Sequence, residues 1–424
     1  MKIAIVGTGI AGNVAAYMLR DRYDITVYEA GSYIGGHTNT IDVEEGGRQI
    51  PVDTGFIVFN DRTYPNFIRI LDEIGQESQP SVMSFSVRTE DDRLEYNGAT
   101  LNTLFAQRRN LFRPSFHRMI RDILRFNDTA VASLENEDPD QPVGEYLRRH
   151  GYSDEFLGHY LIPMAAAIWS SEPVAVADMP LRFLVRFFHN HGLLQLKDRP
   201  QWRVIKGGSR EYVGKLVAGH MDSIRINAPV QAITRHLDGV EVTTAEGGNE
   251  WYDAVFLACH SDQALRMLSN STPAEHEVLG AIEYQDNEAV LHTDASVMPR
   301  RRRAWAAWNY HLPRDPASCV PVTYNMNILQ SLDAEHQYCV TLNNDEHIDP
   351  DKIIRRIQYQ HPIYKRATIA AQARQQEINC ERTYFCGAYW RNGFHEDGVV
   401  SAMNAVEHFE ERLRYGELHL RRAG

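Results

Sequence analysis

The chain has 424 residues, of which 43% are hydrophobic and 24% charged, and its formal net charge is −12. This is the composition of a globular protein that is too long for one ordinary core, so two or three domains are predicted. The acidic balance argues against general nucleic-acid binding, and the longest apolar stretches, such as residues 161–169, are too short to span a bilayer.

Cysteine usage predicts a reducing compartment. Five cysteines are scattered along the chain without a CxxC pair: Cys259, Cys319, Cys339, Cys380 and Cys386. This pattern indicates free thiols and argues against a disulfide framework and against a metal site. A cytoplasmic protein is therefore expected.

The first predicted element is a buried parallel strand at residues 3–6, which enters the sequence Gly7-Thr8-Gly9-Ile10-Ala11-Gly12. A helix with an apolar stripe follows over residues 13–20, and a second strand at 25–28 ends in Glu29. In this setting Gly7 permits a tight turn, Gly9 lets the backbone approach a pyrophosphate, and Gly12 allows the helix to pack on the strand. Glu29 stands where a carboxylate accepts hydrogen bonds from ribose hydroxyls. The segment therefore predicts that a dinucleotide contacts Gly7, Gly9, Ile10, Ala11, Gly12 and Glu29. The alternative is a glycine-rich turn that binds no ligand.

The residues after Glu29 distinguish between dinucleotides. Ala30 is followed within a few residues by Gly35-Gly36-His37-Thr38. An acid followed by a glycine pair resembles the extended FAD signature of the superfamily of flavin amine oxidases, phytoene desaturases and protoporphyrinogen oxidases. Two glycines let a second loop close over the pyrophosphate, so the resemblance implies FAD contacts from Ala30, Gly35, Gly36, His37 and Thr38. The family usually has arginine where this chain has His37, which leaves open a weaker or pH-dependent anion contact, a place near the flavin, or a plain turn histidine.

Further segments resemble later blocks of the same family. Residues 52–56 resemble the block whose backbone lies along the isoalloxazine ring, which implies contacts from Gly55 and Phe56. Residues 204–209 resemble the segment that re-enters the FAD domain, and residues 224–226 with Val230 resemble the strand and turn whose backbone meets the adenine. Residues 240–251 then indicate a hairpin, and residues 253–258 a strand that returns to the Rossmann sheet.

The C-terminal block carries the most specific resemblance. A strand at residues 384–389 contains Gly387, and residues 393–399 lead into an apolar helix at 401–409. In the family this arrangement closes the FAD site, which implies roles for Gly387, Gly398 and Val399, with helix N–H groups bonded to the flavin. The family often has an acid directly after the glycine, whereas this chain has Ala388, so Asp397 is the candidate to bind the ribityl chain. Cys386 does not stand where covalently flavinylated amine oxidases carry their cysteine, so non-covalent FAD is expected.

The expected fold class is α/β, with a discontinuous Rossmann-type FAD-binding domain and a mixed α+β substrate-binding domain. The FAD-binding domain is expected to comprise residues 1–60, 200–285 and 375–424. The substrate domain, with a helical insertion, is expected to comprise residues 61–199 and 286–374.

The helical insertion contains a basic amphipathic stretch at residues 101–127, in which Pro114 is expected to separate two short helices. Apolar residues alternate there with Arg108, Arg109, Arg113, Arg118, Arg121 and Arg125. Such a stretch suggests contact with an anionic membrane surface or a phosphate-bearing lipid, although a solvated face over a core stripe is the commoner explanation. The run of arginines at residues 300–303 has two open interpretations: contact with the same anionic membrane surface, or an exposed turn. The apolar region 156–194 fits a substrate tunnel or, more commonly, a helical core.

In a flavoprotein the cofactor performs the redox chemistry, and the protein supplies orientation and electrostatics. No Ser-His-Asp order, nucleophile elbow or metal-ligand cluster suggests hydrolysis. The residues expected at the reacting centre lie in the C-terminal block and are Tyr389, Trp390, His395 and Glu396, with Glu396 the first choice as proton acceptor. Weaker candidates are His292, Trp308 and Tyr310.

Two features help to choose among the activities of the family. Many of its amine oxidases have a lysine near flavin N5, and this chain has no lysine between Lys215 and Lys352. This lowers the expectation of amine oxidation without excluding it. Residues 305–310 and 391–398 most resemble those of bacterial FAD-dependent oxidoreductases of modified fatty acid synthesis, including furan fatty acid synthesis.

The predicted function is therefore FAD-dependent hydride removal from an apolar substrate, with desaturation of a lipid acyl chain as the first choice. Three alternatives stay open: a flavin amine oxidase that produces peroxide, a carotenoid-type desaturase or isomerase, and a non-catalytic FAD-binding assembly protein. The expected partner is an apolar small molecule or a phospholipid acyl chain, not a nucleic acid. Peripheral contact with the inner membrane face stays open, and the oligomeric state does not follow from the sequence.

Overall fold

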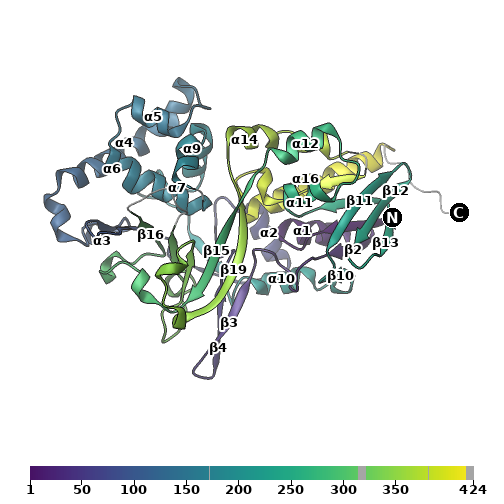
Figure 1. Cartoon of the computed structure of the whole chain (residues 1–424), viewed down its shortest axis with the longest axis horizontal. Helices are drawn as coiled ribbons and strands as arrows, with labels where there is room; N and C mark the ends of the chain where they lie inside the picture. Colours follow the sequence, from purple (N-terminus) through teal and green to yellow (C-terminus); the bar gives the residue numbers. More distant parts are fainter. Residues whose placement is uncertain (171, 314–320, 381, 417–424) are drawn as a thin grey trace.

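The computed structural model describes residues 1–424 except 171, 314–320, 381 and 417–424, so Cys319 lies outside the described residues. Figure 1 shows two lobes joined by long strands, with the N-terminus in one lobe and helices α3 to α9 in the other. Each lobe contains a sheet of its own, and the long strands β15 and β19 run between them.

A five-stranded parallel sheet forms the centre of the first lobe, in the order β10-β2-β1-β14-β20. Its strands are β1 (Lys2–Val6), β2 (Asp24–Tyr28), β10 (Ile224–Arg225), β14 (Ala254–Leu257) and β20 (Thr383–Phe385). They come from the three distant segments that were expected to form the FAD-binding domain. The central strands are short apolar runs, because both faces of such a sheet are covered.

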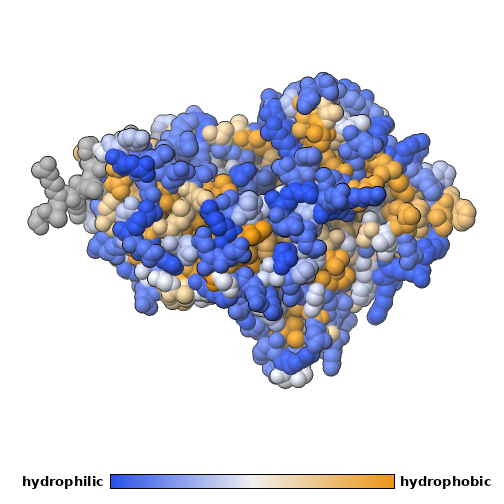
Figure 2. All heavy atoms as spheres, turned by 180° about the vertical axis from the view of Figure 1, so that it is seen from behind, coloured by the Kyte–Doolittle hydropathy of each residue, from blue (hydrophilic) through white to orange (hydrophobic). Residues whose placement is uncertain are grey.

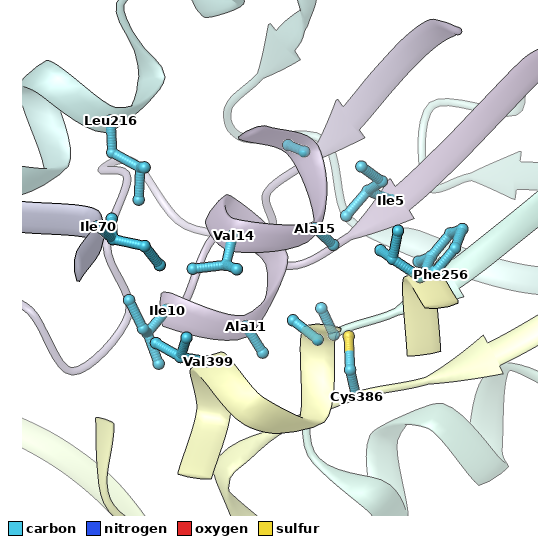
Figure 3. Close-up of a cluster of buried hydrophobic side chains, with 14 of the residues drawn as sticks. Ile5, Ile10, Ala11, Val14, Ala15, Ile70, Leu216, Phe256, Cys386 and Val399 are labelled. Atoms are coloured by element: carbon cyan, nitrogen blue, oxygen red, sulfur yellow. The ribbon is translucent and has the colours of Figure 1, made fainter. Parts of the chain in front are cut away.

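Side chains that alternate along β1 enter two different cores. Ile3 and Ile5 pack with helices on one face, and Ala4 and Val6 pack with a smaller sheet and helices on the other. The first face is covered by α1 (Ile10–Leu19), α2 (Pro65–Glu73), α10 (Arg210–Val217) and α16 (His395–Arg414). Figure 3 shows labelled side chains of all four helices around the centre of this core. The second face is covered by β11 (Val230–His236), β12 (Gly239–Thr244), β13 (Asn249–Tyr252), α11 (Ser261–Met267), α12 (Pro273–Gly280) and α15 (Gln375–Ile378).

A seven-stranded sheet in the order β19-β15-β18-β17-β16-β7-β8 forms the base of the second lobe. All neighbouring strands are antiparallel except β16 and β7, which are parallel. The strands are β7 (Phe85–Thr89), β8 (Glu95–Asn97), β15 (Tyr284–His292), β16 (Trp308–Leu312), β17 (Val322–Asn325), β18 (Cys339–Leu342) and β19 (Ile353–Pro362). The pairing of β15 with β19 carries the chain from the first lobe into this sheet and back.

Helices pack against this sheet and form the outer part of the second lobe. They are α3 (Leu101–Leu104), α4 (Pro114–Asn136), α5 (Val143–Arg149), α6 (Asp154–Phe156), α7 (Ile162–Trp169), α8 (Pro173–Asp178) and α9 (Leu181–Asn190). The prediction of two short helices around Pro114 is wrong for the second helix, because α4 begins at Pro114 and is 23 residues long. Proline at the first position of a helix loses no hydrogen bond, so Pro114 starts α4. Within the described residues, no helix has both the length and the apolar character needed to cross a membrane.

Shorter elements join the lobes. A hairpin of β3 (Thr40–Glu45) and β4 (Arg48–Asp53) precedes a small sheet in the order β5-β9-β6. These strands are β5 (Val58–Asn60), β6 (Ser78–Pro80) and β9 (Trp202–Ile205), and two short helices are α13 (Met326–Leu329) and α14 (Arg366–Gln372). Most of the apolar region 156–194 packs into the helical core, as the commoner explanation requires.

Candidate active site

A cavity of about 690 Å³ lies between the two lobes. On one side it is lined by residues at the carboxyl ends of the parallel strands, including Val6, Tyr28, Ala258 and Gly387. On the other side it reaches residues of α7, β16, β17 and β19 in the second lobe. Open parallel sheets bind their ligands at this carboxyl edge, so the cavity is the candidate site.

The first glycine loop forms the wall beside α1. A Cβ on Gly7, whose φ is +104°, would lie 2.8 Å from the Ala258 carbonyl oxygen, and one on Gly12 would lie 1.9 Å from the Gly7 carbonyl oxygen. By contrast, nothing lies within 4 Å of a Cβ placed on Gly9. No side chain caps the start of α1 at Gly9, so unpaired N–H groups and the positive end of the helix dipole are available to an anion there. Gly7, Gly9, Ile10 and Ala11 line the cavity, whereas Gly12 lies behind its wall.

The carboxylate of Glu29 is held against this loop at the end of β2. It accepts the N–H groups of Thr8 (3.0 Å) and Gly31 (2.7 Å), and it also binds the Thr8 hydroxyl. A carboxylate has more acceptor positions than these three donors fill, so hydroxyl groups of a ligand still find an acceptor. Glu29 and Ala30 both line the cavity.

The second glycine loop lies directly on the first. Gly36 has a φ of +60°, and a Cβ placed on it would lie 3.2 Å from Gly9 Cα. Gly35 has a φ of +135°, and its Cβ would lie 2.5 Å from the Thr38 carbonyl oxygen. Both conformations favour glycine, which explains the pair physically. Gly35 and Gly36 line the cavity, and Thr38 lies behind them.

Phe56 lines the cavity, and buried polar side chains pack behind its ring. Its N–H donates to the His37 carbonyl oxygen (2.7 Å), and its ring stacks on His395 with ring centroids 3.4 Å apart. The Nε2 of His395 lies 3.0 Å from both Thr38 Oγ1 and Tyr212 Oη, which share a 2.6 Å hydrogen bond. Burial lowers the pKa of His395 to about 3. The imidazole is therefore neutral at pH 7 and supports Phe56 by stacking. Gly55 also lines the cavity, and its Cβ would lie 2.2 Å from the His37 carbonyl oxygen.

The carboxylates of the C-terminal block do not line the cavity. Glu396 accepts the Asn66 N–H (3.2 Å), the Asn66 side-chain amide (2.7 Å) and the Phe67 N–H (2.9 Å), so it satisfies the first turn of α2. Asp397 accepts the N–H groups of Asn392 (3.2 Å) and Phe394 (2.9 Å). Burial raises the pKa of Asp397 to about 6. Both side chains thus hold the start of α16 and its neighbours in position.

The other residues of this block divide between the wall and the core. Gly387, Tyr389 and His395 line the cavity, as does Val230 of β11, whereas Trp390 lies behind it. A Cβ on Gly398 would lie 2.5 Å from Ile10 Cγ2, so glycine lets α16 pack closely on α1. Val399 is fully buried in the same core and appears beside Ala11 in Figure 3.

Of the three weaker candidates, only Trp308 lines the cavity. His292 Nε2 lies 2.7 Å from Thr341 Oγ1 inside the second-lobe sheet, and Tyr310 belongs to the helical core.

Besides His395, three histidines line the cavity, and only His37 among these three was a candidate from the sequence. The ring of His37 stacks on Tyr359 (4.7 Å between centroids) and lies 5.2 Å from His361. The ring of His260 stacks on Tyr284 at 4.4 Å. Burial lowers the pKa of His37 well below its usual value, with a further contribution from the nearby His361, and burial also lowers the pKa of His361 to about 4. Tyr359 and His361 are alternate residues of β19, but this period-two signal does not show which strand β19 pairs with, so it does not place them at the cavity.

The second-lobe wall is aromatic and aliphatic. Its apolar members are Ile168, Trp169, Trp308, Tyr324, Leu342, Tyr359, Pro362 and Tyr364, and its polar members are Ser170, Gln360 and His361. Ile57 and Phe394 extend the apolar surface from the first-lobe segments. Among the described residues that line the cavity, Glu29 is the single carboxylate, Arg266 is the single arginine, and none is a lysine. Arg266 forms an ion pair with Asp262 (2.6 Å) on α11, at the end of the cavity near Val230.

Several polar atoms on the cavity-lining residues are buried without a hydrogen-bond partner. In the part of the chain that the structure describes they are His37 Nε2, His260 Nδ1, His361 Nδ1, Trp308 Nε1, Tyr364 Oη and Tyr389 Oη. Buried polar groups are normally paired, so this concentration indicates a site that a ligand or water completes. With the uncapped helix, the open space at Gly9 and the carboxylate of Glu29, these residues fit a dinucleotide whose pyrophosphate lies at the start of α1.

Comparison with known proteins agrees with this geometry. Residues 10–292 match the model of a family described as flavin containing amine oxidoreductase. Putrescine oxidase bound to putrescine is 14% identical with a TM-score of 0.67, over 97% of this chain and 99% of that one. Cyclohexylamine oxidase from Brevibacterium oxydans is 16% identical (TM-score 0.67; 97% and 99%), and the CLA-producing fatty acid isomerase from P. acnes is 15% identical (TM-score 0.66; 96% and 98%). At these identities the likeness shows the fold alone. Comparison with curated proteins gives no match.

The family match covers more than half of the sequence, so the chain belongs to the flavin containing amine oxidoreductases. It is an FAD-dependent oxidoreductase with a Rossmann-type FAD-binding part and a substrate-binding part. The predicted superfamily, fold class and cofactor are therefore confirmed. The closer likeness to oxidoreductases of furan fatty acid synthesis stays a prediction.

Proposed function

We propose that this flavin containing amine oxidoreductase removes a hydride from a C–H bond of an apolar substrate, and that the substrate is a fatty acyl chain of a lipid. The composition of the second-lobe wall carries the proposal. Aromatic and aliphatic side chains predominate there beside the neutral imidazole of His361, and no carboxylate or lysine of the described residues lies on that side. Such a wall favours an alkyl chain and offers no counter-ion to a buried ammonium group, whose desolvation is costly.

In this proposal the first lobe holds FAD, with residues 1–60, 200–285 and 375–424 as the FAD-binding domain. The start of α1, with Gly9 and Gly36 beside it, binds the pyrophosphate, and Glu29 accepts the ribose hydroxyls. Backbone near Val230 meets the adenine, and Gly55 and Phe56 flank the isoalloxazine. Bound FAD supplies the hydride acceptor. The remaining expected residues divide between the cavity wall and the packing behind it: Ile10, Ala11, Ala30, Gly35, His37 and Gly387 on the wall, and Gly12, Thr38, Asp397, Gly398 and Val399 behind it.

The cysteines near the site support non-covalent attachment. Cys386 is fully buried in the core of the first lobe (Figure 3) and does not line the cavity. Cys259 lines the cavity, but burial raises the pKa of its thiol to about 12. A thiol that stays protonated is a poor nucleophile, so neither cysteine is suited to form a bond to the flavin.

Desaturation removes a hydride from one carbon and a proton from the next, and it leaves a C=C bond. We assign the proton to His361, whose Nδ1 has no hydrogen-bond partner and which lies on the same wall as Tyr359. Burial lowers the pKa of His361 to about 4, so its imidazole is unprotonated at pH 7, although the same shift makes it a weaker base than an exposed histidine. Glu396 is the poorer choice, since three N–H groups of α2 already occupy its carboxylate.

The test of the substrate class is anaerobic flavin absorbance of the FAD-loaded protein, titrated with phospholipids that carry unsaturated or methyl-branched acyl chains. Bleaching of the oxidised band together with a new double bond in the lipid supports the proposal. A double-bond shift without net bleaching replaces desaturation by isomerisation. Bleaching by amines alone overturns the proposal in favour of amine oxidation, bleaching by carotenoid precursors alone favours a carotenoid-type enzyme, and no bleaching by any of them favours a non-catalytic role.

The role of His361 has its own test. The His361→Gln variant should reduce its flavin with substrate at least about a hundredfold more slowly, the usual loss for a missing proton acceptor, at unchanged FAD affinity. His276→Gln, at an exposed position of α12 outside the cavity, is the matched control and should react at the wild-type rate. Equal rates in both variants would remove His361 from the mechanism.

A further inference from the structure

The far end of the helical lobe combines exposed apolar side chains with arginines. It is built from α3 and two 3₁₀ turns, η1 (Arg108–Phe112) and η5 (Arg302–Ala304), of which α3 and η5 pack together. Leu101, Leu111 and Phe112 are 76%, 44% and 86% exposed. Figure 2 shows hydrophobic surface at this end of the molecule. We call this surface the arginine-ringed tip; it consists of Leu101, Arg108, Arg109, Leu111, Phe112, Arg302 and Arg303.

The backbone of the tip is held in place, so the exposure of these side chains is a feature of the fold. In η1, the His117 Nε2 lies 2.8 Å from the Leu111 carbonyl oxygen, and Arg108 donates to the Asn102 side chain (2.6 Å). Ahead of η5, the fully buried carboxylate of Glu95 accepts the Arg300 N–H (2.8 Å) and pairs with Arg301 (2.7 Å). Large apolar side chains on such a fixed surface mark an interaction site when they lie together.

The charge of the tip is opposite to that of the whole chain, whose formal net charge is −12. The nearby carboxylates of Asp91 and Asp92 pair with Arg93 (3.1 Å) and Arg300 (2.6 Å). The four tip arginines have no carboxylate partner among the described residues. Arg108 and Arg109 donate to carbonyl and amide oxygens, and Arg302 lies over the Trp305 ring at 5.3 Å. Arg109 shares a surface hollow with Asp91 and Asp92, whereas the guanidinium charges of Arg108, Arg302 and Arg303 are available to an anionic partner.

We propose that the arginine-ringed tip docks this protein on an anionic lipid bilayer. Phe112 and the two leucines enter the boundary between headgroups and acyl chains, while the arginines bind lipid phosphates. Apolar insertion and a basic cluster are two weak signals that together give stable but reversible attachment. The acidic remainder of the surface is repelled by the same bilayer, so the tip also sets the orientation of the protein. This inference does not rest on the proposed function, because docking is measured without any turnover.

The test is co-sedimentation of the FAD-loaded protein with vesicles of phosphatidylglycerol and phosphatidylcholine, compared with vesicles of phosphatidylcholine alone. The protein should bind the anionic vesicles and leave them at high salt, where charges are screened. Each arginine near an anionic surface contributes roughly fivefold to partitioning, so Arg302→Glu with Arg303→Glu should weaken binding by about 25-fold or more. Phe112→Ser should weaken it roughly tenfold through lost apolar burial.

Matched controls lie outside the tip. Arg355→Glu with Arg366→Glu makes the same charge change at exposed positions of β19 and α14, and Leu237→Ser removes an exposed apolar side chain from the β11–β12 turn. Both control variants should bind vesicles like the wild type, and all variants should keep their bound flavin and their midpoint of thermal unfolding. Equal binding to neutral and anionic vesicles, no binding at all, or wild-type binding by the tip variants would overturn the proposal.

Discussion

Replacing Gly9 with alanine separates cofactor binding from folding. Gly9 has φ −64° and ψ 179°, which alanine adopts without strain, and nothing lies within 4 Å of a Cβ placed there. Alanine is a poorer N-cap than glycine, so the free energy of unfolding of the FAD-free protein should fall by no more than about 1 kcal/mol. The added methyl group occupies the space at the start of α1 that the pyrophosphate needs. FAD affinity should therefore fall at least tenfold, about 1.4 kcal/mol.

The assay is a titration of the FAD-free protein with FAD, followed by flavin fluorescence, beside urea unfolding of the same sample. Gly98→Ala is the matched control, because nothing lies within 4 Å of its Cβ either and Gly98 lies outside the cavity. This control should change neither FAD affinity nor stability by much. A Gly9→Ala protein that binds FAD with the wild-type Kd would refute the placement of the pyrophosphate at α1.

Further predictions concern the second loop, the C-terminal block and acid stability. Gly36→Ala and Gly46→Ala place alanine at φ +60° and +57°, so both should lose about 1–2 kcal/mol of stability in urea unfolding. Only Gly36→Ala, whose Cβ would lie 3.2 Å from Gly9 Cα, should also lose FAD affinity. Equal FAD affinities of the two variants would contradict the close packing of the second glycine loop on the first. Glu396→Gln should lower the unfolding free energy by about 1–2 kcal/mol through α2 and leave the stopped-flow rate of flavin reduction unchanged, whereas a slower rate at full stability would return Glu396 to the reacting centre. The folded protein keeps His395 neutral to about pH 3, while the unfolded chain protonates it below its ordinary pKa of 6.5. Stability should therefore fall with pH below 6.5 by about 1.4 kcal/mol per pH unit from this group, and His395→Gln should show a correspondingly shallower slope in urea unfolding at pH 7, 6 and 5. Identical slopes would show that His395 is not held neutral.

The parts of the site that the sequence predicts are those whose chemistry is local. Gly7 and Gly35 have backbone angles that favour glycine, and Gly9 stands at a helix start that follows a strand. Glu29 is brought to the same loop by the pairing of two neighbouring strands. Each of these requirements extends over a few residues, so spacing along the chain is enough to express it.

The substrate wall could not be predicted in this way, because it is formed by pairing between distant segments. Tyr359 and His361 reach the cavity only because β19 pairs along its length with β15. The hydrogen bonds of Glu396 also join distant segments, since their donors Asn66 and Phe67 lie about 330 residues earlier in the chain. Sequence reasoning placed Glu396 near the flavin-closing loop and had no means of seeing that α2 would approach it. The apolar run at 156–194 is ambiguous for a related reason, because core and tunnel walls use the same residue types.

The central claim is that FAD serves an apolar, uncharged acyl substrate in this cavity. The most direct measurement is the anaerobic flavin absorbance of the FAD-loaded protein with two ligands of equal chain length, methyl oleate and oleylamine. The neutral wall predicts that methyl oleate perturbs or bleaches the flavin band at concentrations at which oleylamine at pH 7 does not. Bleaching by oleylamine, with no response to methyl oleate, would contradict the account and identify the protein as an amine oxidase.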